Sequence, residues 1–81
     1  MTIIQLQTFM TIIELGSFSA AANALGYAQS TVTTQIKQLE EELNCLLFER
    51  LGKSIIPTQE GERLLVYANK ILQLTNEIQH N

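Results

Sequence analysis

Apolar side chains recur at helical spacing in three successive segments of the first half of the chain. In residues 2–15 the apolar positions are Leu6, Phe9, Ile12 and Ile13. This recurrence predicts an amphipathic helix that Gly16 closes. Residues 17–26 offer N-cap hydroxyls in SFS, continue as the alanine-rich run AAANAL and end in glycine, which predicts a second, short helix. In residues 27–43 the apolar positions step by four, three and four along one face, at Val32, Ile36, Leu39 and Leu43. These steps predict a third helix with one buried face, ending at Asn44.

After Asn44 the helical spacing gives way to two short runs that flank a glycine. Residues 46–50 and 54–56 lie on either side of Leu51-Gly52-Lys53, which predicts a β-hairpin with glycine at the turn. Pro57 has no backbone donor, so we expect the second strand to end there. Thr58 is the N-cap candidate of a final helix that runs to about His80.

The final helix is long and carries a broad apolar face, which needs a surface to lie against. A series at positions 64, 68, 71, 75 and 78, interrupted by Thr75, approximates a heptad seam. This helix therefore needs a partner surface to lie against. Its predicted interface consists of Leu64, Leu65, Ala68, Ile71, Leu72 and Ile78.

The predicted fold class is mainly α with a small β-hairpin. Its layout is that of a winged helix-turn-helix over residues 1–57, followed by a long dimerisation (linker) helix over residues 58–81. The spacing of Ala22, Gly26 and Val32 supports this layout. Two helices that cross steeply over a short turn need a small residue, a permissive backbone and a buried contact at such positions.

The third helix begins with poor helix formers. Its four early Ser and Thr residues lower the stability of the helix by roughly 2 kcal/mol relative to alanine. Their hydroxyl groups are therefore expected to have a function. At about 100° per residue, the polar groups point away from the apolar face. In a DNA major groove such groups can hydrogen-bond to base edges, and Thr methyls can contact the thymine methyl. Capping and solvation are the commoner roles for such residues, but the preceding turn and the following hairpin favour DNA. The candidate reading residues are Gln29, Ser30, Thr33, Thr34 and Lys37.

A formal net charge of -3 and an isoelectric point near 4.9 argue at first against nucleic acid. The distribution of charge answers this objection. Residues 28–38 contain Lys37 and no acid, and residues 50–59 contain Arg50 and Lys53 and no acid. We expect the eight acids, all glutamates, to lie away from the bases. If each protomer of a dimer neutralised about three phosphates, the salt slope would be on the order of -5.

The remaining composition bounds the other classes of function. One Cys45 and one terminal His80 support neither a disulfide nor a metal site, and we expect no cofactor and a reducing cytoplasm. No leader-like segment and no apolar run near the ~20 residues of a membrane span are present, so we expect a soluble chain.

The chain resembles the LysR-type transcriptional regulators of bacteria. The matching residues are the run LQTFMTIIELGSFSAAANALGYAQSTVTTQIKQLEEELNCLLFER and the later PTQEG, which together cover nearly the whole chain from Leu6. The resemblance implies an N-terminal winged helix-turn-helix, a linker helix that pairs with that of a second protomer, and a C-terminal effector-binding domain absent from this chain.

The resemblance also assigns roles to residues. It places the major-groove reading on Gln29, Ser30, Thr33 and Thr34, and the wing contact on Lys53 with Arg50 beside it. Family members bind inverted repeats of double-stranded DNA upstream of the genes they control. They do so as dimers or as dimers of dimers, and a small-molecule effector alters how they engage the promoter.

Three positions depart from the family pattern. Ala28 stands where a serine usually caps the third helix, so either about 1 kcal/mol of capping is lost or Ser30 becomes the cap. Thr34 replaces arginine or another long polar residue, so the bidentate guanine contact is missing and we infer a target richer in A·T. Pro57 replaces a leucine, and we expect it to stiffen the entry to the final helix.

Two other classes of function compete with DNA binding. In a protein-interaction module, the final helix would mediate association and the acidic surface would never meet DNA; retention on a mixed-sequence duplex pool at low salt separates the two. An enzyme finds little support, because the sequence has no Gly-rich phosphate loop and no nucleophile beside a base. Cys45, within the apolar run ELNCLLF, fits a buried structural thiol. A membrane-surface helix would need more cations than Arg63 and Lys70.

Overall fold

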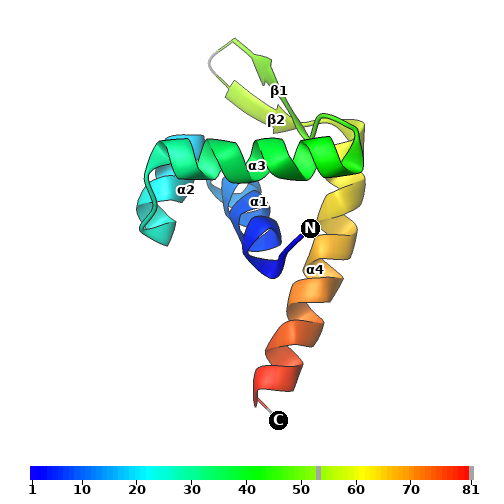
Figure 1. Cartoon of the computed structure of the whole chain (residues 1–81). Helices are drawn as coiled ribbons and strands as arrows, with labels where there is room; N and C mark the ends of the chain where they lie inside the picture. The colour runs from blue at the N-terminus through cyan, green and yellow to red at the C-terminus, as the bar shows by residue number, and fades with distance from the viewer. Residues whose placement is uncertain (53, 81) are drawn as a thin grey trace.

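The computed structural model describes residues 1–52 and 54–80. Its elements follow one another in the predicted order (Figure 1). They are α1 (Ile3–Leu15), α2 (Phe18–Leu25), α3 (Gln29–Leu43), β1 (Phe48–Leu51), β2 (Ser54–Pro57) and α4 (Gln59–His80). The two strands pair antiparallel, from Phe48 opposite Pro57 to Leu51 opposite Ser54. This arrangement confirms the predicted fold class, a mainly α winged helix-turn-helix followed by a long helix.

Side-chain caps fix the starts of three helices. At α1, Thr2 accepts from the Gln5 amide while the Gln5 side chain accepts from the Thr2 amide, which forms a capping box. At α2, the Ser17 hydroxyl accepts from the Ala20 amide. At α4, Thr58 accepts from the amide of Gly61 at 3.0 Å. The predicted caps at Ser17 and Thr58 are therefore confirmed.

The first three helices end where the sequence predicted. Gly16, Gly26 and Asn44 follow α1, α2 and α3, and each adopts the left-handed conformation with φ of 72°, 75° and 55°. Glycine takes this conformation without strain, and asparagine takes it more readily than most other residues. Because the three helices stop sharply, α2 and α3 can fold back across α1.

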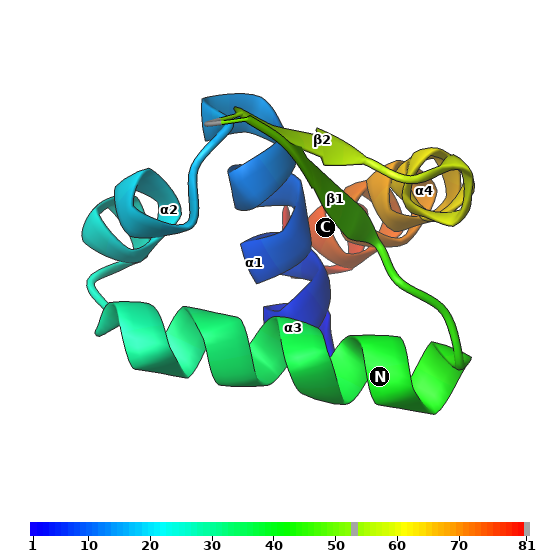
Figure 2. The same cartoon turned by 90° about the horizontal axis from the view of Figure 1, so that it is seen from above.

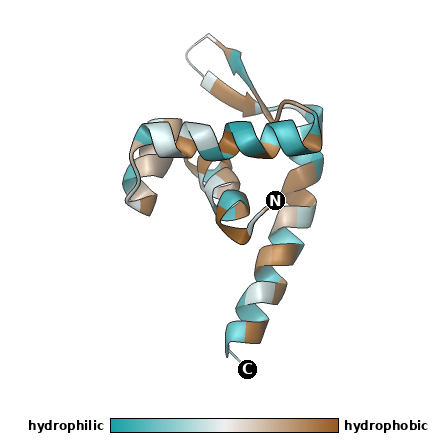
Figure 3. Ribbon diagram, viewed as in Figure 1, coloured by the Kyte–Doolittle hydropathy of each residue, from teal (hydrophilic) through white to brown (hydrophobic). Residues whose placement is uncertain are grey.

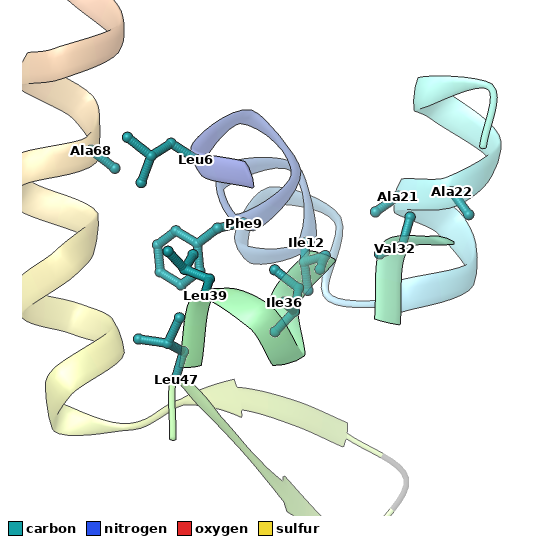
Figure 4. Packing of buried hydrophobic residues seen from close by; sticks show 10 residues of the cluster. All are labelled: Leu6, Phe9, Ile12, Ala21, Ala22, Val32, Ile36, Leu39, Leu47 and Ala68. Carbon is teal, nitrogen blue, oxygen red and sulfur yellow. The ribbon is translucent and has the colours of Figure 1, made fainter. Parts of the chain in front are cut away.

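The core forms around α1, which lies between α2, α3 and α4 (Figure 2). Figure 4 shows its apolar side chains meeting those of α3 on one side and of α4 on the other. The fully buried hydrophobic residues are Leu6, Phe9, Ile12, Ala21, Ala22, Val32, Ile36, Leu39, Leu47 and Ala68. Val32, Ile36 and Leu39 occupy the predicted inner face of α3, whereas Leu43, predicted on the same face, is 37% exposed. The side of α3 opposite the three buried residues is turned outward.

The first strand begins two residues later than predicted. Leu47 precedes it and is buried in the core, whereas its neighbour Leu46 is 66% exposed. Phe48 then anchors the hairpin, with its ring centroid 5.4 Å from that of Phe9 and 5.5 Å from that of Phe18. These aromatic contacts hold the base of the hairpin against α1 and α2. Pro57 is the last residue of the second strand, as expected.

The first turn of α4 approaches the backbone before β1 very closely. The amide of Thr58 donates to the Leu47 carbonyl at 3.0 Å, and the Thr58 hydroxyl donates to the Leu46 carbonyl at 2.6 Å. A Cβ placed on Gly61 would overlap the Leu47 carbonyl oxygen and lie 3.2 Å from the Cβ of Pro57. Glycine at position 61 therefore lets α4 leave the hairpin at this angle.

The structure corrects the predicted dimer face of α4. Ala68 is 0% exposed and faces Leu6 of α1 within its own domain (Figure 4), so it has no surface left for a partner. Four more residues of the predicted face are half-buried and pack against the same core, namely Leu64, Leu65, Ile71 and Leu72. The predicted seam thus mixed residues that cover the chain's own core with residues such as Ile78, which is 77% exposed.

Two smaller findings concern the thiol and the membrane. Cys45 is a free thiol that packs half-buried against the core, so the expected burial is only partial. Within residues 1–52 and 54–80, no helix has the length and apolar character needed to cross a bilayer.

Candidate nucleic-acid interface

All five residues predicted to read DNA lie on the exposed surface of α3. They are Gln29, Ser30, Thr33, Thr34 and Lys37. Their exposure follows from the burial of Val32, Ile36 and Leu39, because residues on the opposite side of a helix must face solvent. In Figure 3, α3 carries white and teal residues interspersed with brown ones and lies beneath the hairpin.

Ser30 does not cap α3. The helix begins after Ala28, which makes no side-chain hydrogen bond to the first turn, and Ser30 is the second residue inside the helix. The capping energy of about 1 kcal/mol is therefore lost, and the Ser30 hydroxyl is not committed to the helix N-terminus. Four hydroxyl or amide side chains and one cation are thus presented by the first turns of α3.

A groove of about 280 Å³ separates α3 from the hairpin. Gln29, Thr33 and Lys37 line it from α3, and Arg50 and Ile55 line it from the strands. The groove brings three of the five predicted reading residues and one predicted wing residue to the same surface. Ser30 and Thr34 are exposed on α3 but are not among its lining residues.

Two carboxylates also line this groove, which the charge distribution along the sequence did not predict. Glu49 is exposed on β1, next to Arg50. Glu40 lies one turn after Ile36, and its carboxylate accepts a hydrogen bond of 2.7 Å from the Leu47 amide. Glu40 is therefore tied to the loop before the hairpin, whereas Glu49 stands where a nearby phosphate would be repelled.

Of the two predicted wing cations, Arg50 lies within the described residues. It is exposed on β1 and pairs in register with Ile55 of β2. The other predicted wing residue, Lys53, lies outside the described residues. The sequence also did not single out Phe18, Leu46 and Ile55, which form part of the apolar lining of the groove, because only tertiary packing brings them there.

A stripe of three exposed apolar residues and one half-buried one runs along α4 beside the face that packs on α1. It consists of Tyr67, Ile71, Leu74 and Ile78, in steps of four, three and four residues. Tyr67 and Leu74 are each 59% exposed, and Ile71 is half-buried. The second half of α4 extends away from the other elements (Figure 1). This stripe is therefore a candidate interface for a second helix, displaced by one position from the predicted seam.

The sequence matches one protein family and is similar to several bacterial regulators. Residues 3–62 match the family described as "Bacterial regulatory helix-turn-helix protein, lysR family". The chain is 53% identical over 73 residues to the HTH-type transcriptional regulator YwqM of Bacillus subtilis (strain 168). It is 51% identical over 73 residues to the HTH-type transcriptional regulator CzcR of Bacillus thuringiensis subsp. konkukian. Both matches cover 90% of this chain and 25% of the relative, so the chain spans about a quarter of the length of these curated relatives.

Solved structures show the same architecture. The BenM DNA-binding domain in complex with catB site 1 DNA superposes with a TM-score of 0.94 at 35% identity, over 99% of this chain and 90% of that one. The CbnR DNA-binding domain in complex with DNA superposes with a TM-score of 0.92 at 34% identity, over 99% and 92% of the two chains. The two relatives are named as transcriptional regulators, and the two neighbours are DNA-binding domains solved with DNA. The chain belongs to the lysR family of bacterial regulatory helix-turn-helix proteins, and its fold is that family's winged helix-turn-helix DNA-binding domain.

Proposed function

We propose that this chain binds inverted-repeat promoter DNA as a homodimer in the bacterial cytoplasm, with α3 in the major groove and the hairpin on the flanking minor groove or phosphates. The observation that carries the proposal is the exposed polar face of α3, beside a groove that also contains Arg50. A solvated helix has no need for four weak helix formers on its outward side. The neighbouring BenM and CbnR domains, solved with DNA, support binding to double-stranded DNA.

Base reading falls on the short polar side chains of α3. Gln29 can bond to adenine through its amide, and the Thr33 and Thr34 methyls can contact the thymine methyl. No arginine lies on α3, so the bidentate contact to guanine is missing. We expect a half-site richer in A·T than in G·C. Lys37 and Arg50 contact phosphates, which contribute affinity without sequence preference.

The homodimer forms through the exposed stripe of α4. A lone protomer offers Lys37, Arg50 and Lys53 to phosphate, which is too few for strong binding at physiological salt. Two protomers double that number and place two copies of α3 on two half-sites. The stripe of Tyr67, Ile71, Leu74 and Ile78 has the a/d spacing of a helix seam, which suits a second copy of the same helix.

In this proposal the chain has two parts with different roles. Residues 1–57 form the reading head and residues 58–81 the linker and dimerisation helix. A C-terminal effector domain, which the resemblance implies, would bind the small-molecule effector and join dimers into tetramers.

Selection of duplexes from a random-sequence pool tests the DNA proposal. Recovery of an inverted repeat is the expected result, and no enrichment of any sequence over the pool would contradict it. Substitutions on α3 then test the reading residues.

In the same selection, Thr33→Ala should change the preferred base at one position of each half-site. Thr31→Ala, on the same helix but about 160° around from Thr33, should leave base preference unchanged. Lys37→Ala should weaken binding to every duplex about equally, and it should lower the salt slope of the affinity by about 1 per protomer.

Sedimentation tests the dimer. Leu74→Lys places a charge in the exposed apolar stripe and should yield a monomer that keeps its helical content. Gln73→Lys adds the same charge one residue away, outside the stripe, and should remain a dimer. Equal sedimentation of the two variants would show that the stripe is not the interface.

A further inference from the structure

A single polar side chain is sealed inside the described core. Thr8 of α1 is 0% exposed, and its hydroxyl donates a hydrogen bond to the side-chain carbonyl oxygen of Gln35 on α3. Gln35 is half-buried, on the flank of α3 between the core face and solvent. The bond therefore joins α1, the central helix, to the middle of the helix that carries the reading residues.

The other contacts of this part of α3 are apolar. Val32 and Ile36 pack against the core, and Ala28 provides no side-chain cap. The remaining side-chain bonds of α3 come from Glu40 and Glu42, near its C-terminal end. Among the described residues, Thr8–Gln35 is thus the side-chain hydrogen bond that joins the reading half of α3 to another helix. Apolar contacts are non-directional, whereas a hydrogen bond weakens steeply as its geometry is lost.

The orientation of α3 matters because base contacts tolerate little displacement. Side-chain tips lie about 5–6 Å from a helix axis, so a roll of about 10° about that axis moves them by about 1 Å. Donor–acceptor distances for hydrogen bonds span only about 0.5 Å. A roll of this size would therefore break base contacts while leaving apolar packing largely intact. Phosphate attraction, which acts over longer distances, would change little.

We propose that the Thr8–Gln35 hydrogen bond sets the rotation of α3 and that Thr8 and Gln35 are positioning residues for sequence reading. Neither residue contacts DNA in this proposal. Gln35 lies about 160° around α3 from Thr33 and Thr8 is fully buried, so both act through the helix they orient. The inference rests on the proposed function, because it assigns a role in the selectivity of the same site.

The experiment compares binding to two duplexes of equal length: the one selected from the random pool and an unrelated one. Thr8→Val keeps the shape of the buried side chain and removes its donor, whereas Thr8→Ser keeps the hydroxyl. Gln35→Leu removes the acceptor of the same hydrogen bond, and because Gln35 is only half-buried this change disturbs the core less. It replaces Thr8→Val as the test variant if Thr8→Val does not fold. The readout is the ratio of the two affinities, with thermal stability measured alongside.

The expected result is a loss of selectivity without a matching loss of general DNA binding. Thr8→Val and Gln35→Leu should each lower the ratio about fivefold or more, the lower end of the effect of one mismatched base pair. Thr8→Ser should restore the ratio, and the double variant should be no worse than either single one, because both changes remove the same bond.

The possible failures can be told apart. Variants that melt at a lower temperature but keep the wild-type ratio would overturn the inference and leave DNA reading intact. Losses that add in the double variant would overturn it too, because the two residues would then act separately. A wild-type chain with no preference between the duplexes would overturn the proposed function, and the positioning role with it.

Discussion

Gly61→Ala offers a sharp test of the structure, because local propensity and tertiary packing predict opposite signs. Alanine is favoured over glycine inside a helix by about 1 kcal/mol, so α4 considered alone should become more stable. In the folded domain the new Cβ would overlap the Leu47 carbonyl oxygen. That oxygen cannot move freely, because it accepts a hydrogen bond of 3.0 Å from the Thr58 amide.

The net effect can be worked from these terms. Overpacking costs typically 1–3 kcal/mol, and a backbone obstacle belongs near the upper end. After subtraction of the gain in propensity, we expect a net destabilisation of about 2 kcal/mol. For a domain of this size, that lowers the melting temperature by roughly 8–16 °C.

Thermal unfolding followed by circular dichroism measures this change, at one fixed protein concentration because the chain is proposed to dimerise. Asn76→Ala is the matched control, since it is exposed on the same helix and gains propensity without a clash. It should raise the melting temperature slightly. A Gly61→Ala variant that melts at or above the wild-type temperature would refute the close approach of α4 to the loop before β1.

Three further substitutions test the caps and the core. Ala28→Ser should supply the missing cap of α3 and raise the free energy of unfolding in urea by about 1 kcal/mol; no gain would mean that the hydroxyl does not reach the first turn. Thr58→Ala should lower it by about 1–2 kcal/mol, because Thr58 bonds both to the Gly61 amide and to the Leu46 carbonyl, and Thr58→Ser should recover most of the loss. Phe9→Ala should cost about 3–5 kcal/mol and leave much of the chain unfolded at room temperature, whereas a cooperative transition near the wild-type midpoint would contradict its central place in the core.

The sequence by itself determined the elements, the caps of α2 and α4 and the ends of the first three helices. Ser17 and Thr58 signal helix starts through their own side chains, and Gly16 and Gly26 signal helix ends through their backbone freedom. These are interactions within a few residues, so they can be read from the order of amino acids. The same holds for the exposed face of α3, because a helix with Val32, Ile36 and Leu39 buried must turn its other side outward.

Tertiary structure decided which neighbour covers each apolar residue. Helical spacing places Ala68 and Leu74 on the broad apolar side of α4, but only the crossing of α1 over α4 buries Ala68 and leaves Leu74 exposed. In the same way, the packing of the hairpin brings Glu49 into the groove beside Lys37, although twelve positions separate them in the sequence. Periodicity reports how wide an apolar face is. The angle at which two helices or a hairpin meet depends on side chains from distant parts of the chain, and no local pattern contains it.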